Sequence, residues 1–238
     1  GTRSYNGTNV VSNTDLTTFS NLVSGESLSI TGSGTILSGA VGSNKAVTIG
    51  TLALSNNTGA ASNYNLDSAS LTVTQRIISL SGSRSYNGNT TINNSDINSL
   101  NNIVSGESLS LSGTGTVVSA NAGNNKSISL GSLSIGDGTG SVSNYTLTGG
   151  SHTVNINKRV INLSGSRVYD GSGDATAAVL STMSNLVSGE TLSLSGTGSV
   201  DSAAVAANKT VNIGSLTLSD GSGESDNYTL TAGTHTIE

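Results

Sequence analysis

Three side chains that can form a spontaneous isopeptide bond recur together three times along the chain. In such a bond the amine of a desolvated Lys joins an Asn side chain while a neighbouring carboxyl group carries protons. The sets are Glu26, Lys45 and Asn63, then Glu107, Lys126 and Asn144, then Glu190, Lys209 and Asn227. One crosslink per copy is therefore a hypothesis, which a mass lower by one ammonia per copy would test. The structural alternative is a Glu after a turn, a Lys along a sheet edge and an Asn in a turn.

Two acidic stretches carry carboxylates at alternating positions, as calcium-binding loops do. Their carboxylates are Asp170, Asp174, Asp220, Glu224 and Asp226. Neither stretch has the full ligand pattern of such a loop, and residues 55–62 of the first copy contain no carboxylate at all. We therefore expect solvated acidic turns and no metal.

Other residues typical of catalytic sites are sparse. His152 and His235 are the only His residues, and they align with each other and with Leu71. Their wide separation predicts surface positions on the rim of a sheet. No Gly-x-Ser-x-Gly nucleophile motif with ordered partners and no phosphate-binding loop is present. We expect neither an enzyme nor a bound cofactor.

These residues recur because the chain contains three copies of one unit. The segment Arg3–Gly7 returns as Arg84–Gly88 and as Arg167–Gly171, at offsets of 81 and 83 residues. All six Tyr occupy two equivalent positions in each copy. Scarce residues at repeated places indicate structural roles and give no unique catalytic constellation.

We place the copies at residues 1–75, 76–158 and 159–238. Gly1 aligns with Gly82, so the first copy lacks the strand that leads the other two unless another segment supplies it. The chain also begins without Met, which favours a piece of a longer protein.

Each copy has the pattern of an all-β fold. Apolar residues alternate with Ser and Thr, as at Leu28 with Ile30 and at Leu71 with Val73, which is typical of half-buried strands. The pair Asn6–Gly7 predicts a type I′ hairpin turn. About seven short strands per copy predict an immunoglobulin-like β-sandwich. The alternative, a β-helix, would show a shorter period of roughly 20 to 30 residues.

One stretch of each copy has helical spacing instead. Leu16, Phe19, Leu22 and Val23 lie at the positions of one helical face, and the other copies repeat the pattern from Ile97 and from Leu180. Ser95 is the expected N-cap. We predict one short helical or 3₁₀ segment per copy, with its central side chains in the core; these are Phe19, Leu100 and Met183.

The stretches between copies predict stiff joints. Residues 72–80 and 154–163 contain no Gly, whereas a flexible tether would be rich in Gly and Ser. They have the character of a last strand that runs into the first strand of the next copy. We therefore expect an extended rod of three tandem sandwiches, with the repeated Arg and Tyr residues supporting turns and joints.

Charge and composition exclude several classes of protein. Nine basic residues against fourteen acidic ones give a net charge of −5, which argues against nucleic acid and anionic membranes as partners. The chain has no Cys, so it has no disulfides, and no apolar run is long enough for membrane insertion. It also has no Pro. Both absences suit a chain exported before folding, because thiol oxidation and prolyl isomerisation would interfere.

Five ordered motifs together resemble the YDG-type repeats. They are Arg-x-Tyr-(Asn/Asp)-Gly, Val-Ser-Gly-Glu-x-Leu-Ser, Asn-Lys, Asn-Tyr-x-Leu and a closing Lys-Arg-Val-Ile strand. Such repeats occur, beside bacterial immunoglobulin-like (MBG) repeats, in large filamentous-haemagglutinin-like adhesins. The first two copies depart from the family in having Tyr-Asn-Gly for Tyr-Asp-Gly, which keeps the turn chemistry. The resemblance implies stalk repeats of a secreted bacterial surface adhesin or biofilm-matrix protein, exported across the outer membrane.

The expected partners follow from that resemblance. They are neighbouring repeats of the same longer chain, a glycan or matrix polysaccharide bound through the parent protein, and a second molecule in lateral self-association. An alternative is a carbohydrate-binding module with Tyr, Asn and Asp on exposed loops, although Tyr beside a turn is more often packed. An ice-binding face would need a regular Thr ladder, and the Thr spacing is irregular.

Overall fold

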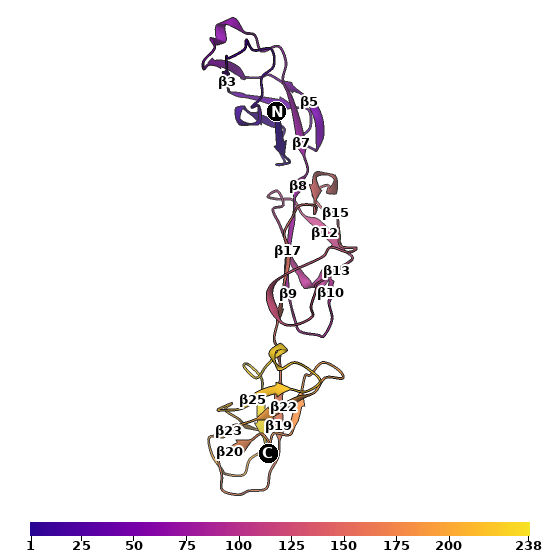
Figure 1. Ribbon diagram of the computed structural model, residues 1–238, viewed down its shortest axis with the longest axis vertical. Coiled ribbons are helices and arrows are strands. Elements are labelled where there is room, and N and C mark those ends of the chain that lie inside the picture. Colours follow the sequence, from indigo (N-terminus) through magenta and orange to yellow (C-terminus); the bar gives the residue numbers. More distant parts are fainter. The chain divides into compact units, whose positions relative to one another are not determined.

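The computed structural model describes residues 1–238, and its regular structure is almost entirely β-strand (Figure 1). Its helical segments are five 3₁₀ turns of three residues each. No helix has the length and apolar character needed to span a membrane. The predicted all-β fold of three repeated sandwiches is confirmed.

The first copy contains one large sheet and one two-stranded ribbon. Its elements are β1 (Thr2–Ser4), β2 (Val10–Ser12), η1 (Asn13–Asp15), β3 (Leu28–Thr31), β4 (Ser33–Ile36), β5 (Gly42–Thr48), β6 (Ala53–Asn56), η2 (Ala61–Asn63) and β7 (Ser70–Thr74). The large sheet has the order β1-β7-β5-β4-β2, in which only β1 and β7 are parallel. β3 and β6 form the antiparallel ribbon.

The core of the first copy follows from the two-residue alternation. In β3 the side chains of Leu28 and Ile30 are buried while those between them are exposed. In β7 the buried side chains are Leu71 and Val73. Burial of such a side chain is worth about 1.5–3 kcal/mol, so these alternating residues stabilise the sandwich despite the scarcity of aromatic residues.

The second copy repeats these elements behind one additional leading strand, and its equivalent of β1 is longer. Its elements are β8 (Arg76–Ile77), β9 (Ser79–Ser85), β10 (Thr91–Asn93), η3 (Asn94–Asp96), β11 (Ile97–Asn101), β12 (Leu109–Ser112), β13 (Thr114–Thr116), β14 (Gly123–Ser127), β15 (Ser134–Asp137), η4 (Val142–Asn144), β16 (Tyr145–Thr146) and β17 (His152–Asn157). They form a β11-β9-β17-β14 sheet and the pairs β10-β13, β12-β15 and β16-β8.

The third copy has the same arrangement. Its elements are β18 (Arg159–Val160), β19 (Asn162–Gly165), β20 (Asp174–Thr176), β21 (Thr182–Ser184), β22 (Leu192–Ser195), β23 (Thr197–Ser199), β24 (Lys209–Thr210), β25 (Thr217–Asp220), η5 (Ser225–Asn227), β26 (Tyr228–Thr229) and β27 (His235–Ile237). These strands form one four-stranded sheet of the order β21-β19-β27-β24 and the two-stranded pairs β18-β26, β20-β23 and β22-β25.

The chain divides into two compact units, and the middle copy contributes residues to both. The first unit consists of residues 1–80, 99–113 and 132–151, and the second of residues 81–98, 114–131 and 152–238. Contacts between the first and middle copies fall inside the first unit. Contacts between the middle and third copies fall inside the second unit, so each joint belongs to one compact body.

The predicted helical segment is a strand or an irregular stretch. Residues 97–101 form β11 and residues 182–184 form β21, which pairs antiparallel with β19. A few apolar residues at helical spacing stabilise a helix only weakly. A neighbouring strand offers hydrogen-bond partners to the backbone and so favours the extended conformation. The side chains predicted for the core are only half-buried; they are Phe19, Leu100 and Met183.

Short 3₁₀ turns precede this segment in two copies. They are capped by Ser12 with Asp15 and by Asn93 with Asp96, so Ser95 lies inside a turn and is not the cap. The third copy has Val179 at the position of these Asp residues and has no 3₁₀ turn there. Loss of the capping carboxylate accounts for that difference.

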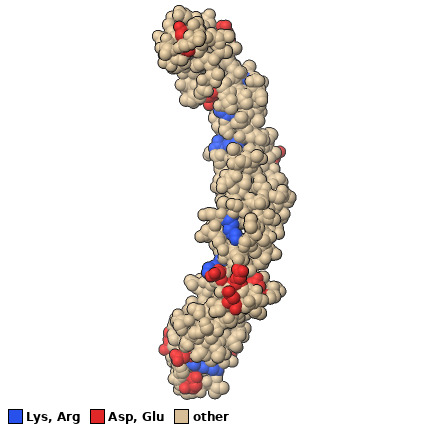
Figure 2. Space-filling view, in the orientation of Figure 1, with Lys and Arg blue, Asp and Glu red and all other residues tan.

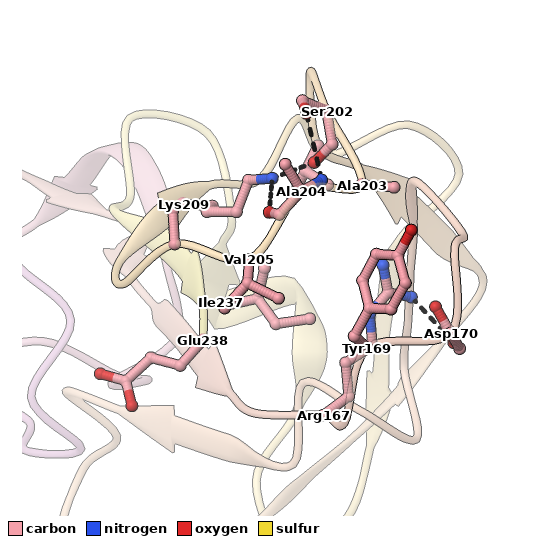
Figure 3. A pocket seen from close by; sticks show the side chains of 12 residues that line it. Arg167, Tyr169, Asp170, Ser202, Ala203, Ala204, Val205, Lys209, Ile237 and Glu238 are labelled. Carbon is pink, nitrogen blue, oxygen red and sulfur yellow. Dashed lines mark hydrogen bonds and ion pairs between the residues drawn. The ribbon is translucent and has the colours of Figure 1, made fainter.

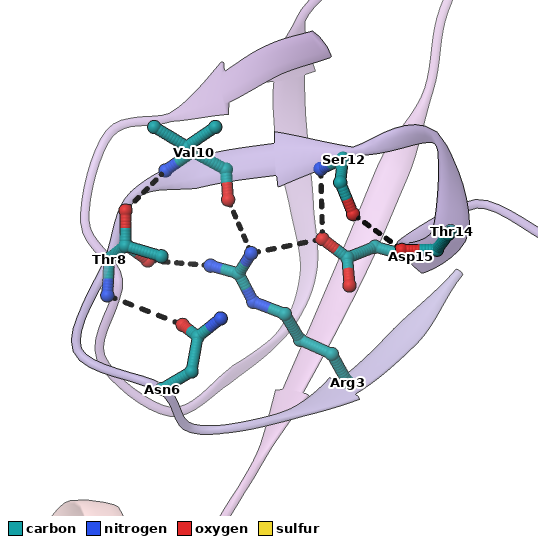
Figure 4. A network of polar contacts seen from close by, with 7 residues as sticks. All are labelled: Arg3, Asn6, Thr8, Val10, Ser12, Thr14 and Asp15. Atoms are coloured by element: carbon teal, nitrogen blue, oxygen red, sulfur yellow. Dashed lines mark hydrogen bonds and ion pairs between the residues drawn. The ribbon is translucent and has the colours of Figure 1, made fainter. Parts of the chain in front are cut away.

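The Arg-x-Tyr-x-Gly segment forms a wide loop held by its Arg (Figure 4). The guanidinium of Arg3 donates to the carbonyl oxygens of Thr8, at 2.5 Å, and Val10, and it contacts Asp15 Oδ2 at 3.0 Å. Gly7 has a φ of 79°, but Asn6 does not share a positive φ. The predicted type I′ hairpin is therefore wrong, because the buried Arg organises a longer loop.

Candidate functional site

The most distinctive polar cluster of the first unit lies where the first copy meets the second. The Tyr5 hydroxyl donates to Oε1 of Glu107 at 2.5 Å, and the Tyr145 hydroxyl donates to Oε2 at 2.6 Å. The two rings meet edge to face, with centroids 5.4 Å apart. Hydrogen bonds to an ionised carboxylate are short and roughly twice as strong as neutral ones. One carboxylate thus joins a Tyr from each copy, and with Asn144 these residues form the first joint cluster.

The second unit repeats this arrangement between the middle and third copies. The hydroxyl of Tyr86 donates to Oε1 of Glu190 at 2.7 Å, and that of Tyr228 donates to Oε2 at 2.6 Å. The ring centroids are again 5.4 Å apart. With Asn227 these residues form the second joint cluster. The same atoms therefore make the same contacts at both joints.

A buried Asn adds a hydrogen bond from the main chain of the preceding copy. Asn144 Oδ1 accepts from the N–H of Val41 at 2.9 Å, and Asn227 Oδ1 accepts from the N–H of Ala122 at 2.7 Å. Both Asn side chains are buried. Because an unpaired buried amide costs free energy, these bonds favour the docked arrangement of the copies.

The Arg of each joint strand makes a third set of contacts. Arg76 donates to the carbonyl and side-chain oxygens of Asn102 at 2.6 and 2.7 Å, and to the carbonyl of Tyr5 at 3.2 Å. Arg159 contacts Asn185 and the Tyr86 carbonyl in the same way. These Asn residues were not among the predicted site residues, although they recur at equivalent positions of the copies.

The Val-Ser-Gly-Glu motif places the Glu by a tight turn. The N–H of Glu107 donates to the carbonyl of Val104 at 3.0 Å, and Gly106 has a φ of 85°, as the third position of a type II turn requires. Gly140 then leaves room for the carboxylate, because a Cβ there would lie 2.3 Å from Glu107 Oε2. The Val-Ser-Gly-Glu turn and Gly140 are far apart in the sequence, and together they fix the position of the Glu107 side chain.

The Gly of the Arg-x-Tyr-x-Gly segment lies against the same turn. A Cβ on Gly7 would lie 2.8 Å from Val104, and one on Gly88 would lie 3.2 Å from Val187. Gly171 of the third copy has a similar φ but no atom within 4 Å. The first two Gly residues therefore permit the close approach of the next copy as well as a turn.

Burial of the repeated Tyr comes from the neighbouring copy. Tyr5 is 7% exposed and Tyr86 is 5% exposed, whereas the equivalent Tyr169 is 63% exposed. Tyr169 lines a small pocket of about 50 Å³ together with Val205, which is equivalent to Val41 and Ala122 (Figure 3). The face that receives a neighbour in the first two copies is thus open to solvent in the third.

The recurrent Lys holds the loop that meets the neighbour. Lys45 Nζ donates to the carbonyls of Ser38, at 2.8 Å, and Ala40. Lys209 makes the equivalent bonds to Ser202 and Ala204 (Figure 3). These contacts fix the loop that precedes the N–H donor of Val41 or its equivalents.

The structure does not bring the Glu, Lys and Asn of one copy together. No hydrogen bond or ion pair joins Lys45 to Glu26 or Asn63. In the middle copy Glu107 and Asn144 belong to the first unit and Lys126 to the second; Lys126 Nζ donates to the Asn121 carbonyl at 2.6 Å. At each of the two joints the Glu and the Asn come from the following copy, and the Lys of the preceding copy holds the loop that donates to that Asn.

The acidic residues considered for calcium have separate partners. No group of three or more carboxylate or His side chains is arranged to hold a metal ion. Asp170 lies 3.5 Å from Arg167, and Asp174 exposes its side chain in β20. Asp220 accepts from the N–H of Ser225 at 2.7 Å, and these hydrogen bonds from Ser225 lower the pKa of its carboxyl group.

The other two acidic residues contribute to the second joint. Glu224 Oε2 accepts from Asn121 Nδ2 at 2.6 Å. Asp226 lies 3.9 Å from Lys158, and both of these side chains are exposed. Such exposed pairs contribute little, about 0–1 kcal/mol, so the joint clusters are the stronger links.

His235 is buried, so its predicted surface position is wrong. Its Nδ1 accepts from the N–H of Leu163 at 3.2 Å, and its Nε2 lies 2.8 Å from the carbonyl of Leu230. This pattern fits a neutral ring that packs a turn. The sheet register aligns His152 and His235 with Ala69 and not with Leu71. The second copy has two more residues than the first between its second Tyr and the joint Arg, and the register places them ahead of this strand.

Alkaline pH should weaken the first joint. Burial, with the hydrogen bond to Glu107, raises the pKa of Tyr5 from 10.0 to about 12. Since the folded state favours the neutral phenol, this stabilisation is complete below pH 10 and is lost as the pH rises toward 12. The difference in tyrosinate absorbance between the wild type and Tyr5→Phe measures this titration. A Tyr5 transition at the ordinary value would contradict the prediction.

The family comparison matches the whole set of repeats. The model of the YDG domain matches residues 1–73, 69–154 and 153–236 in tandem. No curated protein and no solved structure matches the chain.

Proposed function

The chain belongs to the YDG domain family over nearly its whole length, and from this premise we propose that its repeats are a structural spacer. In this proposal the copies form a stiff row that holds a binding region of a longer protein away from a surface. The function is mechanical, and no catalytic step is assigned to the chain.

The observation that carries the proposal is the repetition of the joint clusters. A carboxylate that accepts from two Tyr hydroxyls, one per copy, occurs at both joints with nearly identical distances. A flexible string of domains would not need a buried cluster at each connection. Distribution of stability over repeats and their interfaces is typical of tandem-repeat proteins.

We also propose that the spacer belongs to a secreted bacterial surface adhesin or biofilm-matrix protein. The absence of Cys and Pro supports export before folding. Figure 2 shows a face on which charged residues are few, which suits a spacer better than a charged binding surface. Four of the six Tyr lie in the joint clusters, so few remain for the alternative of carbohydrate binding.

The stiffness is tested by a distance measurement across the first joint. Spin labels on Ser29→Cys and Ser110→Cys report two exposed, equivalent positions of neighbouring copies, and the natural chain has no competing Cys. Pulsed electron resonance should give one narrow distance distribution. A reference variant with four Gly inserted after Gln75 should give a broad distribution. An equally broad distribution for the uninserted chain would refute the stiff row.

A further inference from the structure

An open groove of about 710 Å³ runs through the first copy. Its apolar lining includes Leu16, Phe19, Leu22, Leu54 and Leu66. All of these residues belong to the first unit. Most of these side chains are only half-buried, so part of the inner face of this small sandwich of about 75 residues is uncovered. An occupant with apolar side chains would bury them further.

The two walls of this groove lack strand partners. Residues 16–20 and 64–69 are outside every strand. In the third copy the equivalent segments are β21 and β26, which pair with β19 and β18 respectively. In the second copy Tyr145 and Thr146 pair with β8 in the same parallel sense. Within these walls the backbone of Leu16, Tyr64 and Ala69 forms only local or within-sheet hydrogen bonds. Neither wall pairs with a strand along the groove.

The other two copies show what fills the equivalent space. A joint strand enters each of them, and its inward side chains are fully buried; these are Ile78 and Leu80 in one copy and Ile161 and Leu163 in the other. The N–H of Ile78 donates to Thr146 at 2.8 Å, and that of Ile161 donates to Thr229 at 2.9 Å. The strand therefore supplies apolar side chains and backbone bonds together.

A specific polar contact accompanies this strand. Asn102, at a φ of 76°, accepts from Arg76 and donates to the carbonyl of Ile77 at 2.8 Å. The equivalent Asn21 has a φ of 63° and lines the open groove. Its backbone is therefore already in the conformation in which Asn102 and Asn185 bind a strand that carries Arg.

We propose that the groove of the first copy is a receptor site for one β-strand, the joint strand of a neighbouring YDG repeat. The strand has the pattern basic–apolar–Ile–polar–Leu and runs parallel to residues 64–65 and antiparallel to residues 16–20. Apolar side chains at its third and fifth positions enter the groove, and its Arg binds Asn21. The groove belongs to one copy, so this inference does not depend on stiff joints.

The test places the sequence Arg-Ile-Ile-Ser-Leu-Ser of residues 76–81 directly before Gly1, which aligns with Gly82. Hydrogen exchange at residues 16–20 and 64–67 should slow at least tenfold relative to the original chain. A fusion with Asp at the positions of Ile78 and Leu80 should give no such protection. Equal exchange in all three proteins would overturn the proposal, and so would equal protection by both fusions.

A labelled peptide of residues 74–83 provides a second readout on the original chain. Fluorescence anisotropy should show saturable binding that the intact fusion abolishes. Asn21→Ala should weaken this binding about tenfold, while Asn185→Ala, in a copy that is already filled, should leave it unchanged. Saturable binding that is insensitive to Asn21→Ala and to the fused strand would overturn the assignment of the groove. Neither measurement reports on the stiffness of the joints, so its result does not decide the spacer proposal, which is tested by the spin-label distances.

Discussion

Replacing Tyr86 by Ala should lower the free energy of unfolding by about 3–5 kcal/mol, the usual cost of truncating a buried aromatic residue. Tyr86 is 5% exposed, packs edge to face on Tyr228 and donates to Glu190. Its removal leaves a cavity and deprives a carboxylate of a charge-assisted bond. The loss arises at the second joint, because the neighbouring copy provides these contacts.

Chemical denaturation of the variant and of Tyr169→Ala measures this effect. Tyr169 holds the same place in the third copy but is largely exposed, so its replacement should change the free energy by no more than about 0.5 kcal/mol. Tyr86→Phe keeps the ring and should lose only the hydrogen bond, about 1.5–3 kcal/mol. Similar losses of unfolding free energy for Tyr86→Ala and Tyr169→Ala would show that burial of Tyr86 at the joint does not stabilise the protein.

Much of the fold could be predicted from local pattern. The alternation at Leu28 and Ile30 correctly predicted a strand with one buried face, because side-chain direction in a strand has a period of two. The repeated Asn-Lys step has an equally local cause. Asn44, Asn125 and Asn208 all have a positive φ, and the first two lie at irregularities of register in their sheets.

The composition of the joint could not be predicted from spacing. Glu, Lys and Asn recur at the same intervals whether they meet within a copy or across a boundary. The spacing therefore cannot decide whether Lys45 contacts Asn63 of its own copy or holds the loop that contacts Asn144 of the next copy. Only the three-dimensional arrangement decides this. The Gly-free joint strands and the Tyr beside each boundary were the available signals.

Segments that depend on a partner strand were also beyond local reasoning. Leu163 pairs with Met183 in the third copy, whereas the equivalent Phe19 in the first copy lies in an irregular segment. The same apolar spacing therefore has two outcomes in one chain. Long-range backbone pairing decides between them, and a window of a few residues does not contain it.

Removal of the joint carboxylate is expected to have the second large effect. Glu107→Ala should cost about 3 kcal/mol or more, since it removes two bonds to one ionised group and leaves the buried hydroxyl of Tyr5 without its acceptor. Glu26→Ala is the matched control in the first copy. Glu26 accepts only from Tyr64, which is half-buried, so water can replace the lost bond and the cost should be clearly smaller than that of Glu107→Ala.

A double-mutant cycle separates the link between copies from the effect inside one copy. Glu107→Ala combined with Tyr5→Phe should show a coupling free energy of about 1–3 kcal/mol, as residues in direct contact do. Glu26→Ala combined with Tyr5→Phe should show none, because these residues share no contact. In the spin-labelled protein Glu107→Ala should also broaden the distance distribution. Additive losses with an unchanged narrow distribution would mean that strand packing alone, and not the shared carboxylate, keeps the copies in place.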